Sequence, residues 1–104
     1  MAREKFKTLT EQMYYVLLAL QRESCGVDVM ENVRTMTESR IKLGPGTLYA
    51  LLGDFQKAGL IEETKAEGQK KSYVITHKGK ELLKVEHERH LLLIGDFQKY
   101  YRGE

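Results

Sequence analysis

The sequence predicts a mainly α-helical protein with one small β-hairpin, which places it in the α+β class. Three short segments in the first 60 residues repeat apolar side chains at helical spacing. Two β-prone runs around a glycine follow, and a long final segment returns to helical spacing. Because the chain has only 104 residues and no Pro- or Ser-rich linker, we expect one continuous structural unit, with a compact part at 1–76 and a long last helix at 77–104.

The first two predicted helices are marked by their apolar positions and by a break between them. Thr8 and Glu11 have the spacing of a capping box, so the first helix should begin after Thr8 and run to about Glu23. A break at 24–26 ends it, and a shorter amphipathic helix should then run to about Glu38. The apolar positions are Met13, Val16, Leu17 and Leu20 in the first helix, and Val27, Met30, Val33 and Met36 in the second.

A third helix is predicted from Pro45, because proline suits the first helical position, where no backbone N–H bond is needed. Gly59 is well placed to end it as a C-cap. Its apolar stripe is Leu48, Leu51, Leu52 and Phe55. The brief connection between the second and third helices fits a helix-turn-helix arrangement.

The chain then changes to strand character. Residues 60–66 and 70–76 are the expected strands, joined across Glu67, Gly68 and Gln69. The lysine-rich tip of this hairpin should project into solvent or toward a polyanion. Three helices followed by a basic hairpin predict a winged helix-turn-helix domain.

Basic residues are concentrated in two places, although the net charge of +2 is too small to indicate nucleic-acid binding by itself. Five lysines between residues 65 and 80 are accompanied there by one acid, Glu67. Near the N-terminus, Arg3, Lys5 and Lys7 are accompanied by Glu4 alone. This distribution fits a surface that faces phosphates, and equally a solvated face of mixed charge.

The last helix should run from Thr76 to Tyr101 and be apolar on more than one side. The alternating four-three spacing of a coiled-coil seam joins Leu83, His87, His90, Ile94, Phe97 and Tyr101. Residues 91–93 are all leucine and add apolar surface on other faces. We expect a second copy of the chain to cover this helix, the alternative being that it folds back on its own domain. The predicted dimer interface is Leu83, Leu91, Ile94, Phe97 and Tyr101.

Residues 43–52, Leu-Gly-Pro-Gly-Thr-Leu-Tyr-Ala-Leu-Leu, and the following Ala58-Gly59-Leu60-Ile61 resemble the signature of PadR-type transcriptional regulators. Residues 72–79 resemble that family's second wing strand leading into its last helix, and residues 9–20 resemble its opening. The resemblance implies a homodimer that reads a palindromic DNA operator, with the third helix in the major groove and the wings on the flanking backbone. Repression is the family expectation, and the single last helix is similar to the smaller PadR subgroup.

The candidate DNA-binding residues lie where such a fold meets DNA. Thr47 and Tyr49 should face outward in the first turns of the third helix, where their hydroxyls can reach phosphates or base edges. Tyr49 has the alternative of being a half-buried packing residue. The side chains that complete the set are Lys42, Lys57, Gln69, Lys70 and Lys71. Gly53 and Asp54 stand where PadR-like chains commonly carry basic or polar residues, which shifts the expected affinity toward the wing.

Some members of the small subgroup bind flat aromatic or drug-like molecules between subunits. Tyr15 and Phe97 are the candidates to line such an effector pocket here, with ordinary aromatic packing as the alternative. A rival hypothesis is a winged-helix metal sensor that uses His87 and His90, which lie three apart on one helix face. Without metal, the same histidines could make a dimer respond to pH. A third hypothesis is an interaction module that dimerises and ignores DNA.

Catalysis, cofactors and membranes find no support in the sequence. There is no Gly-rich phosphate loop, Gly-x-Ser-x-Gly elbow or Cys-x-x-Cys pair, so we expect neither enzymatic activity nor a cofactor. The single cysteine, Cys25, is expected to be buried and inert rather than redox-sensing. No apolar run approaches the roughly 20 residues that span a bilayer, and the charged first seven residues do not resemble a signal peptide. A cytoplasmic location is the resulting expectation.

Overall fold

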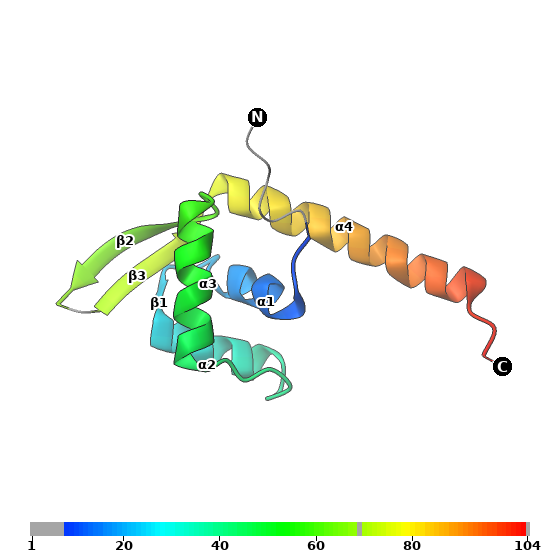
Figure 1. Ribbon diagram of the computed structural model, residues 1–104, viewed down its shortest axis with the longest axis horizontal. Helices are drawn as coiled ribbons and strands as arrows, with labels where there is room; N and C mark the ends of the chain where they lie inside the picture. The colour runs from blue at the N-terminus through cyan, green and yellow to red at the C-terminus, as the bar shows by residue number, and fades with distance from the viewer. Residues whose placement is uncertain (1–7, 69, 104) are drawn as a thin grey trace.

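The computed structural model describes residues 8–68 and 70–103. Its elements are, in chain order, α1 (Glu11–Ala19), β1 (Ser24–Cys25), α2 (Gly26–Met36), α3 (Pro45–Lys57), β2 (Ile61–Glu67), β3 (Lys70–Ile75) and α4 (His77–Tyr100). The β2–β3 hairpin projects from one side of the helical body, and the second half of α4 projects from the other (Figure 1). The predicted α+β class is confirmed, with three helices, a hairpin and a long last helix. None of the helices within 8–68 and 70–103 has the length and apolar content to cross a membrane.

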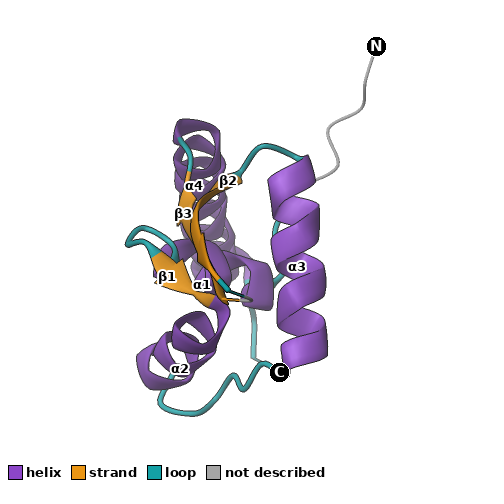
Figure 2. Ribbon diagram, turned by 90° about the vertical axis from the view of Figure 1, so that its left-hand side faces the viewer, coloured by secondary structure: helices purple, strands orange, loops and turns teal. Residues whose placement is uncertain are grey.

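The sheet has three antiparallel strands in the order β1-β3-β2 (Figure 2). The predicted hairpin is confirmed, with Ile61 opposite Ile75 at its base and Glu67 opposite Lys70 at its tip. The strand β1 was not predicted, because two residues are too few to show the alternation of a strand. Ser24 pairs with Tyr73 and so attaches the chain before α2 to the wing.

Helix α1 differs from its prediction at both ends. Thr10, and not Thr8, is the N-cap, and its side chain accepts a hydrogen bond from the N–H of Met13 at 3.2 Å. The capping-box prediction is therefore wrong, because Leu9 is buried in the core and the chain is still extended at Thr10. The helix stops at Ala19, before the predicted Glu23, because the carbonyl of Leu20 accepts a hydrogen bond from the N–H of Ile75 in the sheet.

The buried face of α2 also differs from the predicted one. Of the four predicted positions, Val33 is fully buried and Met30 packs against the core, whereas Val27 and Met36 are exposed. Val29, which was not predicted, is fully buried. The helix begins at Gly26, which is buried. Its core face is the side of the helix that carries Gly26, Val29 and Val33. It ends at Met36 because Glu38 and Ser39 have left-handed φ angles of 50° and 64°. The buried hydroxyl of Thr37 donates to the carbonyl of Val33 and accepts from the N–H of Ile41.

Helix α3 follows its prediction closely. Pro45 is its first residue, and Leu48, Leu52 and Phe55 are fully buried. Gly59 follows the C-cap with a φ of +77°, a conformation that glycine adopts without strain. The N–H groups of Gly59 and Leu60 then donate to the carbonyls of Gln56 and Phe55, which is a Schellman motif.

The first half of α4 packs against its own domain through one stripe of residues. Gly79 lies so close to β2 that a Cβ atom there would stand 2.2 Å from the carbonyl oxygen of Leu60. Leu83 is 8% exposed and belongs to the core of its own chain, so it offers little surface to a partner, and its place at a dimer interface stays a prediction. Glu86 is fully buried, whereas His87, the predicted seam position, is exposed.

Candidate nucleic-acid interface

The exposed face of α3 lies opposite its buried stripe. Thr47, Tyr49 and Lys57 are all exposed, as the helical periodicity predicted. Three small residues, Gly46, Ala50 and Gly53, lie along the middle of the free side, at three- and four-residue spacing. A face with such short side chains allows the helix backbone to come close to a partner surface.

Tyr49 both packs and remains accessible. A Cβ atom on Gly26 would stand 2.5 Å from the hydroxyl oxygen of Tyr49, so the ring lies directly over the first residue of α2. Even so, Tyr49 is 50% exposed. Tyr49 is therefore packed on α2 and half-exposed at the same time, and its predicted contact with DNA stays a prediction.

A groove of about 660 Å³ connects α3, the start of α2 and the wing. Its lining brings Tyr49 together with Lys70 and Lys71, three of the predicted DNA-binding residues. The other lining residues are Cys25, Gly26, Val27, Asp28 and Tyr73. Cys25, the N-cap of α2, is buried as predicted. The first N–H groups of α2, which carry the positive end of the helix dipole, lie at the same groove.

The wing carries more negative charge than the five lysines between residues 65 and 80 indicated. Lys71 lies 3.9 Å from a carboxylate oxygen of Glu63 on the neighbouring strand. Lys65 lies 4.0 Å from Glu23 and 3.8 Å from Glu67. The sequence did not reveal the pairing of Lys71 with Glu63, because Glu63 lies outside the stretch 65–80 in which the lysines gather. The antiparallel pairing of β2 with β3 brings the two side chains together. The wing surface is thus of mixed charge, with its lysines next to glutamates.

Burial raises the pKa of the Tyr73 hydroxyl, and the nearby Glu63 carboxylate and Tyr49 add to the effect. Tyr73 therefore stays a neutral phenol well into the alkaline range.

Two predicted residues lie outside this groove. Lys42 lines a separate, shallower hollow of about 440 Å³ with Asp28, Glu31 and Arg34 of α2. Lys57 is exposed in the last turn of α3. Gln69 lies outside the described residues, as do the N-terminal Arg3, Lys5 and Lys7.

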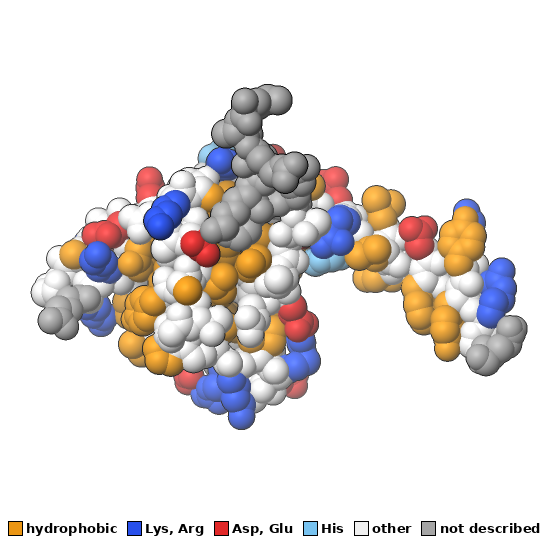
Figure 3. Space-filling model, viewed as in Figure 1, with side chains coloured by type: hydrophobic (Ala, Val, Ile, Leu, Met, Phe, Trp, Pro, Cys, Tyr) orange, Lys and Arg blue, Asp and Glu red, His pale blue; other side chains and the backbone are white. Residues whose placement is uncertain are grey.

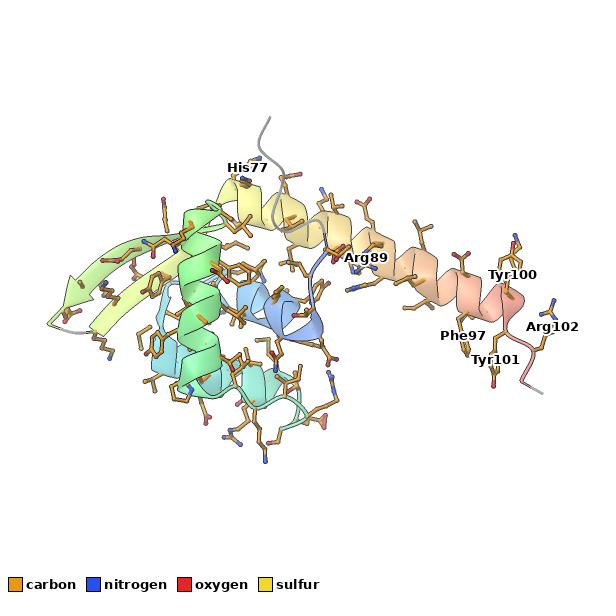
Figure 4. The ribbon with its side chains drawn as sticks, in the orientation of Figure 1. His77, Arg89, Phe97, Tyr100, Tyr101 and Arg102 are labelled. Atoms are coloured by element: carbon orange, nitrogen blue, oxygen red, sulfur yellow. The ribbon has the colours of Figure 1, made fainter. Side chains whose placement is uncertain are left out.

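The predicted effector residues are not brought together within one chain. Tyr15 is half-buried, and its hydroxyl accepts a hydrogen bond from Arg40 at 3.2 Å. Phe97 lies on the projecting end of α4 and stacks on Tyr101, with ring centroids 4.6 Å apart (Figure 4). An effector pocket between Tyr15 and Phe97 would need two chains and stays a prediction.

The two histidines of the metal-sensor hypothesis have different surroundings. The ring of His90 packs against that of Tyr14 at 5.1 Å between centroids, while His87 lines a groove between α1 and α4. Over residues 8–68 and 70–103, no three His, Cys, Asp or Glu side chains come together as a metal-binding group.

The end of α4 is apolar and uncovered. Every residue from 91 to 103 is exposed, and the large apolar side chains among them are between 52% and 69% exposed. Figure 3 shows these hydrophobic side chains gathered on the projecting helix. The predicted interface positions Leu91, Ile94, Phe97 and Tyr101 are all in this segment. The chain therefore offers one surface rich in tyrosine and lysine, and one apolar surface far from it.

Comparison with solved structures supports the fold. A transcriptional regulator from Clostridium thermocellum superposes with a TM-score of 0.74 at 22% identity, covering 88% of this chain and 93% of that one. A PadR family transcriptional regulator from Eggerthella lenta gives 0.70 at 23% identity, covering 88% and 83%. A PadR-like transcriptional regulator from Bacillus cereus gives 0.70 at 26% identity, covering 89% and 93%.

Sequence comparison gives the family directly. No curated protein sequence matches the chain significantly. The profile of the PadR-like family of transcriptional regulators matches residues 16–85, which include α2, α3 and the whole wing. This is a family of regulators and not of enzymes. The chain thus belongs to the PadR-like family and is a winged-helix transcriptional regulator.

Proposed function

We propose that this regulator binds a palindromic DNA operator as a homodimer and represses transcription from it. The observation that carries the proposal is that Tyr49 of α3 and Lys70 and Lys71 of the wing line the same groove. A winged-helix domain places its third helix in the major groove, and the neighbouring wing then meets the flanking backbone. As a DNA-binding protein it would act in the cytoplasm.

Each part of the surface has a separate task in this proposal. Thr47 and Tyr49 read base edges or fix the helix on phosphate, since hydroxyls can do both. Lys70 and Lys71 contact the phosphate backbone, together with the first N–H groups of α2. The glutamate beside Lys71 weakens attraction to any phosphate, so a larger share of the binding free energy comes from contacts that depend on shape and sequence.

The uncovered end of α4 supports the proposed dimer. A helical segment of about ten residues is marginal in water without packing. The residues that pack on their own domain, Gly79, Leu83, Glu86 and His90, alternate at four-three spacing, and Leu93, Phe97 and Tyr100 continue the same series. A second copy presents an identical apolar helix end, so a two-fold arrangement covers both ends at once.

Binding is tested by fluorescence anisotropy with the duplex upstream of this protein's own gene and a shuffled duplex, over a salt series. We expect tight binding to the native duplex, and an affinity that falls steeply as salt rises. Lys70→Ala should reduce the salt slope by about one unit, and Tyr49→Phe should weaken binding to the native duplex selectively. Lys80→Ala is the matched control, because Lys80 lies on α4, beside the α1–α4 groove.

The possible outcomes separate the hypotheses. Equal slopes for Lys70→Ala and Lys80→Ala would refute the assigned wing contact. Failure to bind any duplex at low salt would refute DNA binding and favour the interaction module. If an aromatic effector binds between two subunits, adding it would release the DNA. Phe97→Ala would abolish that release, with light scattering used to verify that the variant is still a dimer.

A further inference from the structure

Glu86 is the most deeply buried charged side chain among the described residues. Its side chain is 0% exposed, in the middle of α4. One carboxylate oxygen accepts a hydrogen bond from the backbone N–H of Leu9, which lies 77 residues away in the sequence. Arg89 donates to both oxygens, at 2.7 and 3.0 Å. The carboxylate therefore joins α4 to the chain that leads into α1. Figure 4 labels Arg89 on α4, at the point where that chain passes the helix.

Glu86 lies near the point where α4 leaves its own domain. Before it, Gly79 and Leu83 are buried against the domain. After it, His87 lines the groove between α1 and α4 and His90 packs on Tyr14, and every residue from 91 to 103 is exposed. Glu86 thus lies near the boundary between the part of α4 that belongs to its own domain and the part available to a partner.

We propose that Glu86 is a positioning residue that fixes the angle at which α4 leaves the domain, and thereby the separation of the two α3 helices in the dimer. This inference rests on the proposed dimer. The contact suits the task because the hydrogen bond from the Leu9 N–H joins α4 to the chain before α1 in a defined direction, and Arg89 on the same helix holds the carboxylate in the orientation that accepts it. A change of angle at Glu86 changes how far each domain stands from the two-fold axis.

The size of the effect follows from helix geometry. Residues 86 to 100 span about 21 Å at 1.5 Å per residue. A tilt of about 10° at Glu86 therefore moves the end of α4 by roughly 4 Å relative to the domain. One base pair advances the DNA axis by about 3.4 Å, so such a tilt is enough to mismatch half-sites at a fixed spacing.

Double electron–electron resonance between spin labels on the two subunits measures this separation. Lys57→Cys places the label at the exposed end of α3, and protein without this substitution shows whether the buried Cys25 reacts. We expect a narrow distance distribution in the otherwise wild-type dimer. Glu86→Gln should at least double its width or shift its mean by several ångström, while light scattering still shows a dimer. Glu88→Gln, which removes an exposed carboxylate two residues away, should leave the distribution unchanged.

Each result decides the proposal. The same narrow distribution in Glu86→Gln and Glu88→Gln dimers would overturn the role of Glu86 and leave the proposed dimer intact. Absence of any inter-subunit coupling in the wild-type background would overturn the dimer, and this role with it. If Glu86→Gln does not fold, Arg89→Gln replaces it, because it keeps the Glu86 carboxylate and removes the guanidinium that orients this carboxylate toward the Leu9 N–H. Broadening is then expected again, and an unchanged width would refute the proposal.

Discussion

Replacing Gly79 with alanine tests the close packing of α4 on the wing. The added Cβ would stand 2.2 Å from the carbonyl oxygen of Leu60 and 2.7 Å from Cγ1 of Ile75. Cβ atoms essentially never approach other atoms within 3.0 Å, so the backbone of α4 must move by about 0.8 Å from Leu60 alone. That carbonyl also accepts the N–H of Thr76 at 2.9 Å, and the movement stretches this bond.

The expected loss of stability combines three contributions. Overpacking of a close contact costs about 1–3 kcal/mol. Weakening the buried hydrogen bond between Thr76 and Leu60 costs about 1 kcal/mol. The greater helix propensity of alanine returns up to about 1 kcal/mol. Gly79→Ala should therefore lower the free energy of unfolding by about 1–3 kcal/mol.

Gly53→Ala is the matched control, since it makes the same chemical change inside α3. Nothing lies within 4 Å of the Cβ that it adds, so only the helix propensity changes. It should raise the free energy of unfolding by up to about 1 kcal/mol. Because the chain has no tryptophan, urea unfolding is followed by far-ultraviolet circular dichroism at one fixed protein concentration. A Gly79→Ala protein as stable as wild type would refute the reasoning, and so would two variants that shift in the same direction.

Three further predictions concern charge and assembly. Phe97→Glu places a charge on the apolar end of α4 and should give monomers by light scattering at concentrations where wild type is dimeric; a persistent dimer would exclude this face as the interface. Glu63→Gln frees Lys71 and should tighten binding to a shuffled duplex by about two- to threefold at low salt only, because exposed ion pairs are weak; unchanged binding would show that the pair does not matter. The ion pair with Arg89 and the Leu9 N–H outweigh burial and lower the pKa of Glu86 from its ordinary 4.5. The charged Glu86 therefore contributes its full stabilisation above pH 4.5, and this contribution is lost as pH falls through the lowered pKa. Glu86→Gln should make the free energy of unfolding fall less steeply below about pH 5. Parallel plots of stability against pH for wild type and variant would contradict this.

The elements that local signals determine were predictable from the sequence. Pro45 and Gly59 act through their own backbone preferences, and both ends of α3 lie where they predict. The exposed side of α3 followed from its periodicity, so Thr47 and Tyr49 could be named in advance. The hairpin followed from two β-prone runs around one glycine.

The remaining features depend on contacts between distant parts of the chain. The start of α1 is displaced because Leu9 is held by Glu86, 77 residues away. The core face of α2 is set by Gly26 under Tyr49, a close contact that no hydrophobic pattern reports. A glutamate in an amphipathic helix is expected in water, so its burial went unpredicted. One signal was available, since an arginine three residues after a glutamate can pair with it on the same helical face.

If the uncovered end of α4 forms the proposed dimer, it also sets how the regulator responds to its own abundance. In the proposed dimer, each subunit completes the other, so the species that occupies an operator forms in proportion to the square of the subunit concentration. Below the dissociation constant of the pair, halving the amount of protein would cut operator occupancy fourfold at low saturation. A gene controlled in this way would be switched within a narrower range of expression than a monomeric regulator allows, and exposed helix ends would mark unpaired subunits for proteolysis.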